Sequence, residues 1–248
     1  MEKNNYIISY NENGHRPVNK AISYERKLRE TAQDIRSAYE IPLMILLQET
    51  LAGRSMKFLN LLRTLFPEYE LIIPAGFDYV SHYKSIVSVT LIRRDALGSY
   101  RVIELDSELP NRICYVVAEL NGMETHIINA HLPQVQNFRY QADWYIAERT
   151  RLHSNQWALL HDILSKNIEA NVIFAGDMQE NKNAANLSKI KDYGYIISGA
   201  SKTVRNSFFN VESCIDHIIL SPSARAALGV ETEIILPERL ELAPKRKK

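Results

Sequence analysis

The chain has few of the residues that stabilise disulfide-rich or zinc-dependent scaffolds. Its 248 residues include only two cysteines, Cys114 and Cys214, each inside an apolar stretch and without a CxxC partner. Disulfide frameworks and structural zinc sites need more cysteine, or Cys and His at closer spacing. We therefore expect both thiols to be buried and reduced.

Long hydrophobic segments are also lacking. No run approaches the roughly 20 apolar residues of a membrane span, and the opening MEKNNYIISYNENG holds only a short apolar stretch before polar residues. A signal peptide needs a longer apolar segment at this place. The sequence predicts a soluble protein without a signal sequence or transmembrane segment, and we expect it in the cytoplasm.

Charge of one sign is not in excess. The 30 Lys and Arg residues balance the 29 Asp and Glu residues, for a formal net charge of +1. The total therefore gives no electrostatic argument for a nucleic-acid or membrane partner, although a local basic stripe is compatible with it. One dense basic block, residues 245–248, closes the chain and is interpreted as a solvated tail.

Internal repeats and Pro-, Gly- or Ser-rich linkers are absent from the sequence, so we expect a single domain over residues 1–248. The sequence does contain short apolar runs bounded by turn residues, and these runs predict strands. Asn121-Gly122 joins two of these runs and predicts a tight hairpin, because both turn positions favour residues that tolerate positive φ. The predicted strands cover residues 6–10, 43–47, 86–92, 113–120, 126–130, 171–175 and 214–220.

Three segments have the apolar spacing of helices. The first follows Ser23 and the second follows Ser55, and each serine is expected to cap its helix. The third spans residues 140–166, with a break expected near His153. Helices interspersed with strands that include hairpins predict a layered α/β sandwich. The apolar faces are formed by Leu28, Ala32, Ile35 and Tyr39, then by Phe58, Leu59, Leu62 and Leu65, and then by Trp144, Ile146, Trp157, Leu160 and Leu164.

Polar residues stand at or near the ends of several predicted strands, where a rigid element holds a side chain more accurately than a free loop does. Each has an ordinary explanation when it is taken alone, such as a turn, a helix cap or a bond to a backbone carbonyl. The exception is Asp216, a carboxylate between Ile215 and Ile218, which must be paired or reach solvent through a cleft. The residues are Asn11, Glu49, His131, Asp177 and Asp216.

The motifs around these residues, in order along the chain, are SYNENG, LLQET, NAHLP, AGDMQ and CIDHIILS. They resemble those of the endonuclease/exonuclease/phosphatase superfamily, which includes deoxyribonuclease I-like nucleases, inositol polyphosphate 5-phosphatases and neutral sphingomyelinases. The resemblance covers Asn11 to His217. It implies a four-layer α/β/β/α sandwich of two packed, mostly antiparallel sheets flanked by helices. It also implies phosphodiester hydrolysis with Mg²⁺, or alternatively Mn²⁺.

The resemblance assigns a role to each residue. Glu49 is similar to the principal divalent-metal ligand of the family, and Asn11 to the residue that holds the metal site or a phosphate oxygen. His131 resembles the histidine that hydrogen-bonds the phosphate. Asp177 looks like the aspartate that orients or activates the attacking water, and Asp216 like the one that buttresses a catalytic histidine. A phosphodiester needs such groups, because it is anionic and its water nucleophile must lose a proton.

The segment around Gly176 predicts a sharp exit from a buried strand. Gly176 is expected to let the chain turn so that Asp177 points into a cleft, Met178 packs back and Gln179 returns to the cleft. Gln179 is then the expected substrate contact. The family usually has Asn there, and the extra methylene of Gln shifts the amide by more than about an ångström unless the backbone compensates.

A second departure concerns the family's late Asp-His motif. Its nearest counterpart here is Glu241-Leu242, and no histidine follows His217. His217 is expected to face away from the cleft if Asp216 faces it, because neighbours on a strand point to opposite faces. Three explanations of the missing histidine stand. The chain is an enzyme that relies on Asp177 and a metal-bound hydroxide, or a slow or inactive domain, or its sequence differs from the native one.

We expect this chain to be an endonuclease whose substrate is DNA. The NAHLP motif argues against the apurinic-site repair branch of the family, which has a tyrosine and asparagine motif there. Alternatives are a phosphoinositide or other small phosphoester, and a degenerate domain that only binds a phosphate-rich partner or another protein. The sequence predicts no oligomeric state. Phosphate-contacting cations are expected among Arg16, Arg54, Lys57, Lys182 and Arg205, with a substrate loop at Phe77, Tyr79 and Tyr83.

Overall fold

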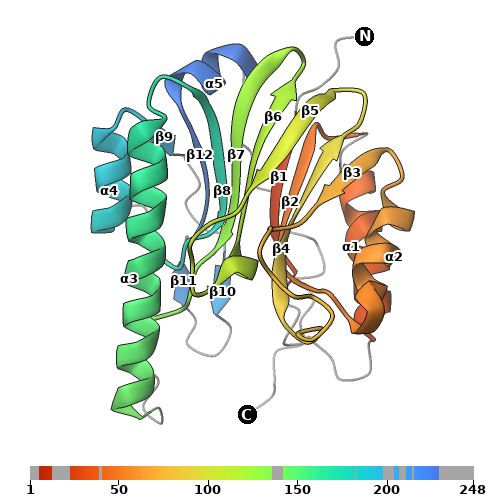
Figure 1. The fold of residues 1–248 in the computed structure, drawn as a ribbon, viewed down its shortest axis with the longest axis horizontal. Coiled ribbons are helices and arrows are strands. Elements are labelled where there is room, and N and C mark those ends of the chain that lie inside the picture. Colours follow the sequence, from red (N-terminus) through yellow and green to blue (C-terminus); the bar gives the residue numbers. More distant parts are fainter. Residues whose placement is uncertain are drawn as a thin grey trace.

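The computed structural model describes residues 6–12, 23–38, 41–135, 142–181, 183–197, 204–206, 211–213 and 215–228. Two β-sheets face each other, and helices cover their outer faces (Figure 1). The layers therefore run helix, sheet, sheet, helix, and the predicted α/β/β/α sandwich is confirmed.

The smaller sheet has four strands in the order β1-β2-β4-β3. β1 and β2 run parallel, and the other pairs are antiparallel. Helices α1 and α2 lie on its outer face (Figure 1). The bounds are β1 (Ile7–Asn11), β2 (Met44–Leu51), β3 (Tyr69–Ile72), β4 (Ile86–Arg93), α1 (Tyr24–Ala38) and α2 (Lys57–Leu65), with a 3-10 turn η1 (Arg54–Met56) before α2.

The larger sheet has six strands in the order β5-β6-β7-β8-β12-β9. β7 and β8 run parallel, and the other pairs are antiparallel. Helices α3 and α4 lie on its outer face. The bounds are β5 (Leu97–Ile103), β6 (Ile113–Leu120), β7 (Met123–His131), β8 (Asn171–Asp177), β9 (Ile196–Ile197), β12 (Asp216–Leu220), α3 (Asp143–Lys166), α4 (Ala185–Asp192), α5 (Pro222–Leu228), η2 (Pro110–Arg112), and a separate pair β10 (Val204–Asn206) and β11 (Val211–Ser213).

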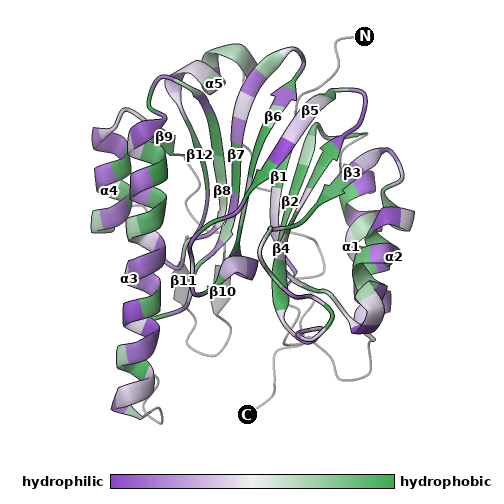
Figure 2. Ribbon diagram, viewed as in Figure 1, coloured by the Kyte–Doolittle hydropathy of each residue, from purple (hydrophilic) through white to green (hydrophobic). Residues whose placement is uncertain are grey.

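Three apolar clusters fill the spaces between the four layers. Along β2, Ile45 and Leu47 pack against α1 and α2, whereas Met44 and Leu46 pack between the two sheets. Successive side chains of a strand point to opposite faces, so one apolar run contributes to two cores. The third cluster joins α3 and α4 to the larger sheet around Trp157. Figure 2 shows the hydrophobic residues concentrated in the strands and many hydrophilic residues on the helices.

The strands predicted from apolar runs are all present, with Asp216 as the first residue of the last one. Asn121 and Gly122 have φ of 49° and 81°, and Leu120 pairs with Met123 across them, so the tight hairpin is confirmed. Cys114 is buried and free, and burial raises the pKa of its thiol to about 12. Cys214 lies outside the described residues.

The helix predictions are confirmed at one N-terminus and wrong at another. The Oγ of Ser23 accepts a hydrogen bond from the backbone N–H of Arg26 at 3.2 Å, as expected for a cap. Ser55 does not cap α2, because Ser55 and Met56 have φ of 54° and 57° and the helix starts only at Lys57.

The break expected near His153 is also wrong. Helix α3 is continuous over 24 residues, because its sequence has no proline or glycine that would interrupt it, and His153 packs within it as a buried residue. The expected apolar face of α3 begins only after its first turns, and Trp144 is 73% exposed. Tyr39, which was expected on the apolar face of α1, lies outside the described residues.

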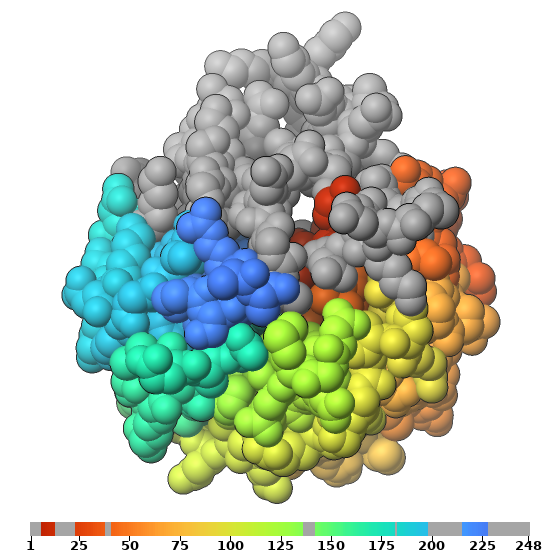
Figure 3. Space-filling model, turned by 90° about the horizontal axis from the view of Figure 1, so that it is seen from above, coloured from red at the N-terminus to blue at the C-terminus, as the bar shows by residue number. Residues whose placement is uncertain are grey.

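The two edges of the larger sheet differ. Figure 3 views the molecule from the edge that carries α5. Ser221, just before α5, exchanges hydrogen bonds with Val172 near the start of β8. The carboxyl end of β8, with Asp177, therefore lies at the opposite edge.

Among the described residues, no helix is long and apolar enough to cross a membrane.

Candidate active site

Four of the predicted residues lie at the carboxyl ends of strands from both sheets. Asn11 ends β1, and His131 and Asp177 end β7 and β8. Because β7 runs parallel to β8 and β1 runs parallel to β2, the carboxyl ends in each pair share one edge. Glu49 reaches this edge through a bulge in β2, where the pairing with β4 shifts register and Glu49 has φ of 55°.

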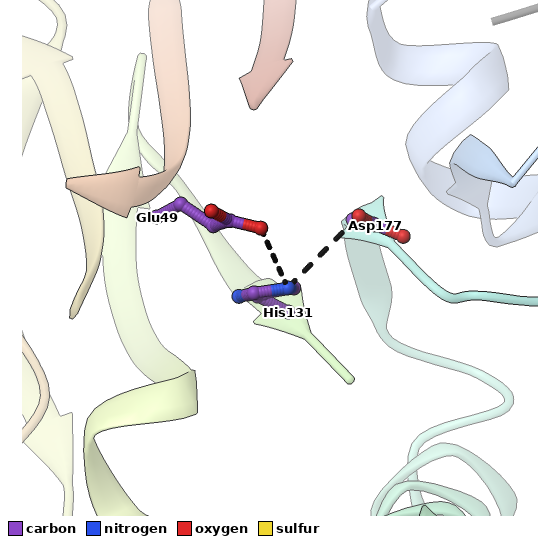
Figure 4. Close-up of side chains that lie close together, drawn as sticks. All are labelled: Glu49, His131 and Asp177. Carbon is purple, nitrogen blue, oxygen red and sulfur yellow. Dashed lines mark ion pairs between the residues drawn. The ribbon is translucent and has the colours of Figure 1, made fainter. Parts of the chain in front are cut away.

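The side chains of Glu49, His131 and Asp177 converge (Figure 4). His131 Nε2 lies 3.3 Å from Glu49 Oε1 and 4.0 Å from Asp177 Oδ2. Asn11 Nδ2 donates to Asp177 Oδ2 at 2.9 Å and to Glu49 Oε1 at 3.4 Å. The structure therefore brings together residues that are up to 166 positions apart in the sequence.

Gln179 belongs to the same group. Its Nε2 donates to Asp177 Oδ2 at 2.6 Å, and its backbone N–H donates to Asp177 Oδ1 at 3.1 Å. Met178 between them is fully buried in the core under α3. The predicted alternation of Asp177, Met178 and Gln179 is therefore confirmed, and Gln179 achieves it with a left-handed φ of 55°.

Asp177 is a buried carboxylate next to a second acid. Its partner across β8 and β12 is Asp216. Burial raises the pKa of Asp177 well above its ordinary value, and the charges of Asp216 and Glu49 raise it further. Hydrogen bonds from Gln179 and Asn11 oppose this shift. A buried group of carboxylates favours a bound proton or a bound cation, since either one reduces the repulsion.

Gly176 is required by a close approach of two strands. It lies inside β8 with φ of 140°, and a Cβ there would overlap the carbonyl oxygen of Ala130 in β7. Ala130 is the partner of Gly176 in the parallel pair, one position before His131. The prediction of a turn at Gly176 is therefore wrong, because the glycine lets β7 and β8 come together directly before the site.

Arg112 is a site residue that the sequence analysis missed. It ends η2, directly before β6, and its Nη1 lies 2.7 Å from His131 Nδ1 and 3.3 Å from Nε2. Burial and the nearby Arg149 lower the pKa of Arg112 to about 10, while Glu49 and Asp177 oppose the shift, so it stays charged at neutral pH. The hairpin register was a usable signal, because counting back from Asn121-Gly122 places Arg112 opposite His131.

The contact with Arg112 determines how His131 is protonated. A guanidinium only donates hydrogen bonds, so the nearer ring nitrogen, Nδ1, must accept. In a neutral ring the proton is then on Nε2, which faces Glu49 and Asp177. This arrangement makes His131 a donor toward anionic oxygens and disfavours it as a metal ligand.

The donor set fits a divalent cation. Ligand atoms of Glu49, His131 and Asp177 lie within 4.8 Å of one another. Oxygen atoms around Mg²⁺ at about 2.1 Å are roughly 3 to 4 Å apart, so small side-chain rotations suffice. Carboxylate and amide oxygens are the ligands that this ion prefers. Glu49 and Asn11 supply them, and Asp177 lies beside them.

His217 occupies the place expected of a structural histidine. It is buried, and its Nε2 donates to the backbone oxygen of Glu180 at 2.8 Å. It follows Asp216 in β12 and so points to the opposite face of the sheet. Glu241 and Leu242 lie outside the described residues.

The expected phosphate-contacting residues have different surroundings. Lys57 forms an ion pair with Glu25 at 3.0 Å, and Tyr79 is buried with its hydroxyl on Pro74 O, so neither is a free substrate contact. Arg54 is exposed and lies 5.3 Å from the ring centre of Tyr83, and Lys84 lies 5.8 Å from the same ring. Phe77 packs against Tyr79. Arg16, Lys182 and the side chain of Arg205 lie outside the described residues.

No protein-family model and no curated protein matches the chain. Solved structures do. Truncated Caenorhabditis elegans TDP2 aligns over 87% of this chain and 83% of its own, with 16% identity and a TM-score of 0.60. An endonuclease/exonuclease/phosphatase from Bacteroides vulgatus aligns over 87% and 86%, with 14% identity and a TM-score of 0.61. The chain has the endonuclease/exonuclease/phosphatase fold.

A β-hairpin deletion mutant of Staphylococcus aureus beta toxin is also similar in fold. It aligns over 87% of this chain and 86% of its own, with 16% identity and a TM-score of 0.57. The fold implied by the five sequence motifs is therefore confirmed. At this identity the likeness concerns the fold alone.

Proposed function

We propose that this chain is a divalent-metal-dependent phosphodiester hydrolase and that DNA is its substrate. The observation that carries the proposal is the convergence of Glu49, Asp177, Asn11 and His131 at one edge of an endonuclease/exonuclease/phosphatase sandwich. Mg²⁺ is the expected ion, with Mn²⁺ as the alternative. When bound, the ion supplies positive charge that stabilises the phosphate oxygens as the bond to the leaving group breaks.

The acidic residues divide two tasks. Glu49 would hold the ion through a carboxylate oxygen. Asn11, whose Nδ2 donates to Glu49 and Asp177 in the structure, would add its amide oxygen after the amide group turns over. Asp177 takes the proton of the attacking water, and a base works best when its pKa lies near the working pH. Burial and Asp216 raise the pKa of Asp177 from its acidic value in that direction. Gln179 fixes the carboxylate of Asp177 by two hydrogen bonds and presents its amide to the substrate.

His131 and Arg112 act on the phosphate. The Nε2–H of His131 donates to a non-bridging oxygen, while Arg112 holds the ring through Nδ1. The buried guanidinium also contributes positive potential in a site of low dielectric, where charge acts strongly. Donors that are already oriented toward the phosphate need no rearrangement as negative charge develops there.

A local cationic surface supports a polynucleotide substrate. Arg54 and Lys84 lie around the half-buried ring of Tyr83, next to the carboxyl end of β2, the strand that carries Glu49. The backbone N–H of Gly53 donates to Tyr83 O at 3.0 Å and joins the two loops. Cations contact the phosphate backbone, and aromatic rings stack on bases. One structural neighbour, D. rerio TDP2, was solved with a single-strand DNA product.

The test is nicking of supercoiled plasmid in the presence of Mg²⁺. Glu49→Gln and Asp177→Asn keep the shape of each side chain and remove its charge. We expect each to lower the rate by about 100-fold or more, the size of effect seen when one transition-state contact is lost. Glu119→Gln, at an exposed position of β6 far along the strand from Arg112, is the matched control and should retain wild-type activity.

Each other outcome has a definite meaning. Equal weak nicking by all variants indicates a contaminating nuclease and favours a degenerate domain that binds phosphate-rich partners. Cleavage of a phosphoinositide or a nitrophenyl phosphodiester by wild type, with plasmid untouched, replaces the DNA assignment by a small-phosphoester hydrolase.

A further inference from the structure

A histidine of α3 joins the two chain segments that leave the candidate active site. His153 Nδ1 lies 2.8 Å from the backbone oxygen of Pro133, and Nε2 lies 3.0 Å from Glu180 Oε1. Pro133 follows His131 by two positions, and Glu180 follows Asp177 by three. One imidazole ring therefore contacts the segments that begin at His131 and at Asp177.

Glu180 is itself held from several sides. Asn186 of α4 donates to Glu180 Oε1 at 2.7 Å, and His217 of β12 donates to the backbone oxygen of Glu180 at 2.8 Å. Trp157 Nε1, one turn further along α3, lies 3.1 Å from His153 Nε2, beside the contact between that nitrogen and Glu180. The turn that carries Gln179 is thus anchored to two helices and a strand.

The polar cluster of His153, Glu180 and Asn186 costs free energy, because its polar groups are removed from water. His153 is 7% exposed and lies at the margin of an apolar core, where an apolar side chain would pack without any hydrogen-bond requirement. The buried Glu180 Oε2 has no hydrogen-bond partner within the part of the chain that the structure describes. Packing of α3 alone therefore does not explain the cluster, whereas control of the geometry at the two strand ends does.

We infer that His153 is a positioning residue: by holding the segments after β7 and β8 together, it reinforces the strand pairing that places His131 beside Asp177. The inference rests on the proposed function. His153 touches neither the substrate nor the ion, and it acts through Pro133 and Glu180. Residues that orient a metal site from behind typically change metal affinity or activity by about 10- to 100-fold when they are removed.

The experiment compares His153→Phe with Tyr195→Phe. Each change keeps a ring and removes two buried contacts to oxygen atoms in the same core: His153 loses those to Pro133 and Glu180, and Tyr195 loses those to Leu164 and Asn167 at the far end of α3. Mn²⁺ affinity of the substrate-free protein, kcat and KM for nicking, and the urea midpoint are measured for both. We expect both midpoints to fall.

Only His153→Phe is expected to weaken Mn²⁺ binding and lower kcat, each by about 10- to 100-fold, with KM little changed. Equal affinity and kcat in the two variants would overturn the inference. A wild-type protein that binds no Mn²⁺ and cleaves no phosphodiester would overturn the proposed function itself, which is a different result.

A second pair of variants covers the case in which His153→Phe does not fold. Glu180→Gln keeps an oxygen opposite His153, and Glu180→Ala removes it. We expect Glu180→Ala to show the same losses of Mn²⁺ affinity and kcat, and Glu180→Gln to retain most of both. Equal losses in both variants, or none in either, would contradict a positioning role.

Discussion

Single residues at the site adopt backbone conformations that most side chains avoid. Glu49 and Gln179 both have φ of 55°, and neither is glycine or asparagine. Each such residue costs about 1 to 3 kcal/mol, which persists only where the surrounding contacts hold it. Here the contacts are those of the site itself, because Glu49 lies against Asn11 and His131, and Gln179 is bonded to Asp177. The strain is the cost of directing both side chains to one edge.

Gly176→Ala tests the close approach of β7 and β8. The new Cβ meets the carbonyl oxygen of Ala130, and the φ of 140° is unfavourable for alanine. We expect the free energy of unfolding to fall by about 3 kcal/mol or more, measured by urea denaturation. Gly122→Ala is the matched control, since Gly122 has φ of 81° and an open surrounding. It should cost only about 1 kcal/mol, and equal losses would show that φ alone matters.

At the scale of elements, the bulge in β2 leaves polar groups that β7 satisfies by hydrogen bonds. The shift of register around Glu49 interrupts the ladder between β2 and β4. Asn129 of β7 reaches across the sandwich and donates to Leu47 O at 3.2 Å and Val89 O at 2.9 Å, and it accepts from Gln48 Nε2 at 2.8 Å. One buried amide thus compensates for the bulge that places Glu49, and it fixes β2 against the strand that carries His131.

Asn129→Leu removes this link between the sheets. Two backbone carbonyls and the amide of Gln48 then lose a partner in a buried place, and an unsatisfied buried group costs about 1 to 3 kcal/mol. We expect roughly 3 kcal/mol of destabilisation in urea, with a loss of nicking activity. Thr125→Val in the same strand is the control, because the Oγ1 of Thr125 donates to Met123 O beside the hairpin, away from the contact between the sheets. A small effect of Asn129→Leu would mean that water or a shift of β2 replaces the amide.

The sequence predicts elements that pack by apolar runs and misses those that do not. Strand β5 escaped because its central residues are exposed, and β3 because it has only four residues. The N-terminus of α2 was wrong because the left-handed Ser55 and Met56 have no composition signal. Site residues on strand ends were found through family motifs, whereas Arg112 and His153 act through partners on other elements. Such pairings depend on how layers face each other, which a single sequence does not reveal.

At the scale of the whole molecule, the candidate site lies where the two sheets meet. Asn11 and Glu49 come from the smaller sheet, and His131 and Asp177 come from the larger one. Their separation therefore depends on how the sheets pack on each other through the central apolar cluster. A change that loosens this packing should affect stability and activity together.

Buried charge makes the stability of the whole molecule depend on pH. Glu12 follows β1 and is fully buried, and burial raises its pKa from 4.5 to about 7, with Lys27 opposing the shift. Between pH 4.5 and about 7 the folded state keeps a proton that the unfolded chain has released. The stability that neutral Glu12 contributes is therefore fully present below pH 4.5 and is lost as the pH rises through 7. His161 and His217 act in the opposite sense, because burial lowers the pKa of each and costs stability below pH 6.5.

Glu12→Gln isolates the first effect, since the variant keeps the shape and never ionises. We expect it to be more stable than wild type by about 3 kcal/mol above pH 7.5, because burial raises the pKa of Glu12 from 4.5 to about 7. The difference should shrink steadily toward pH 4.5, and the histidine contributions cancel in the comparison. Urea unfolding between pH 5 and 8.5 without divalent ions measures it, with Glu169→Gln as the exposed control. A gap that does not change with pH would show that Glu12 is not buried as a neutral acid.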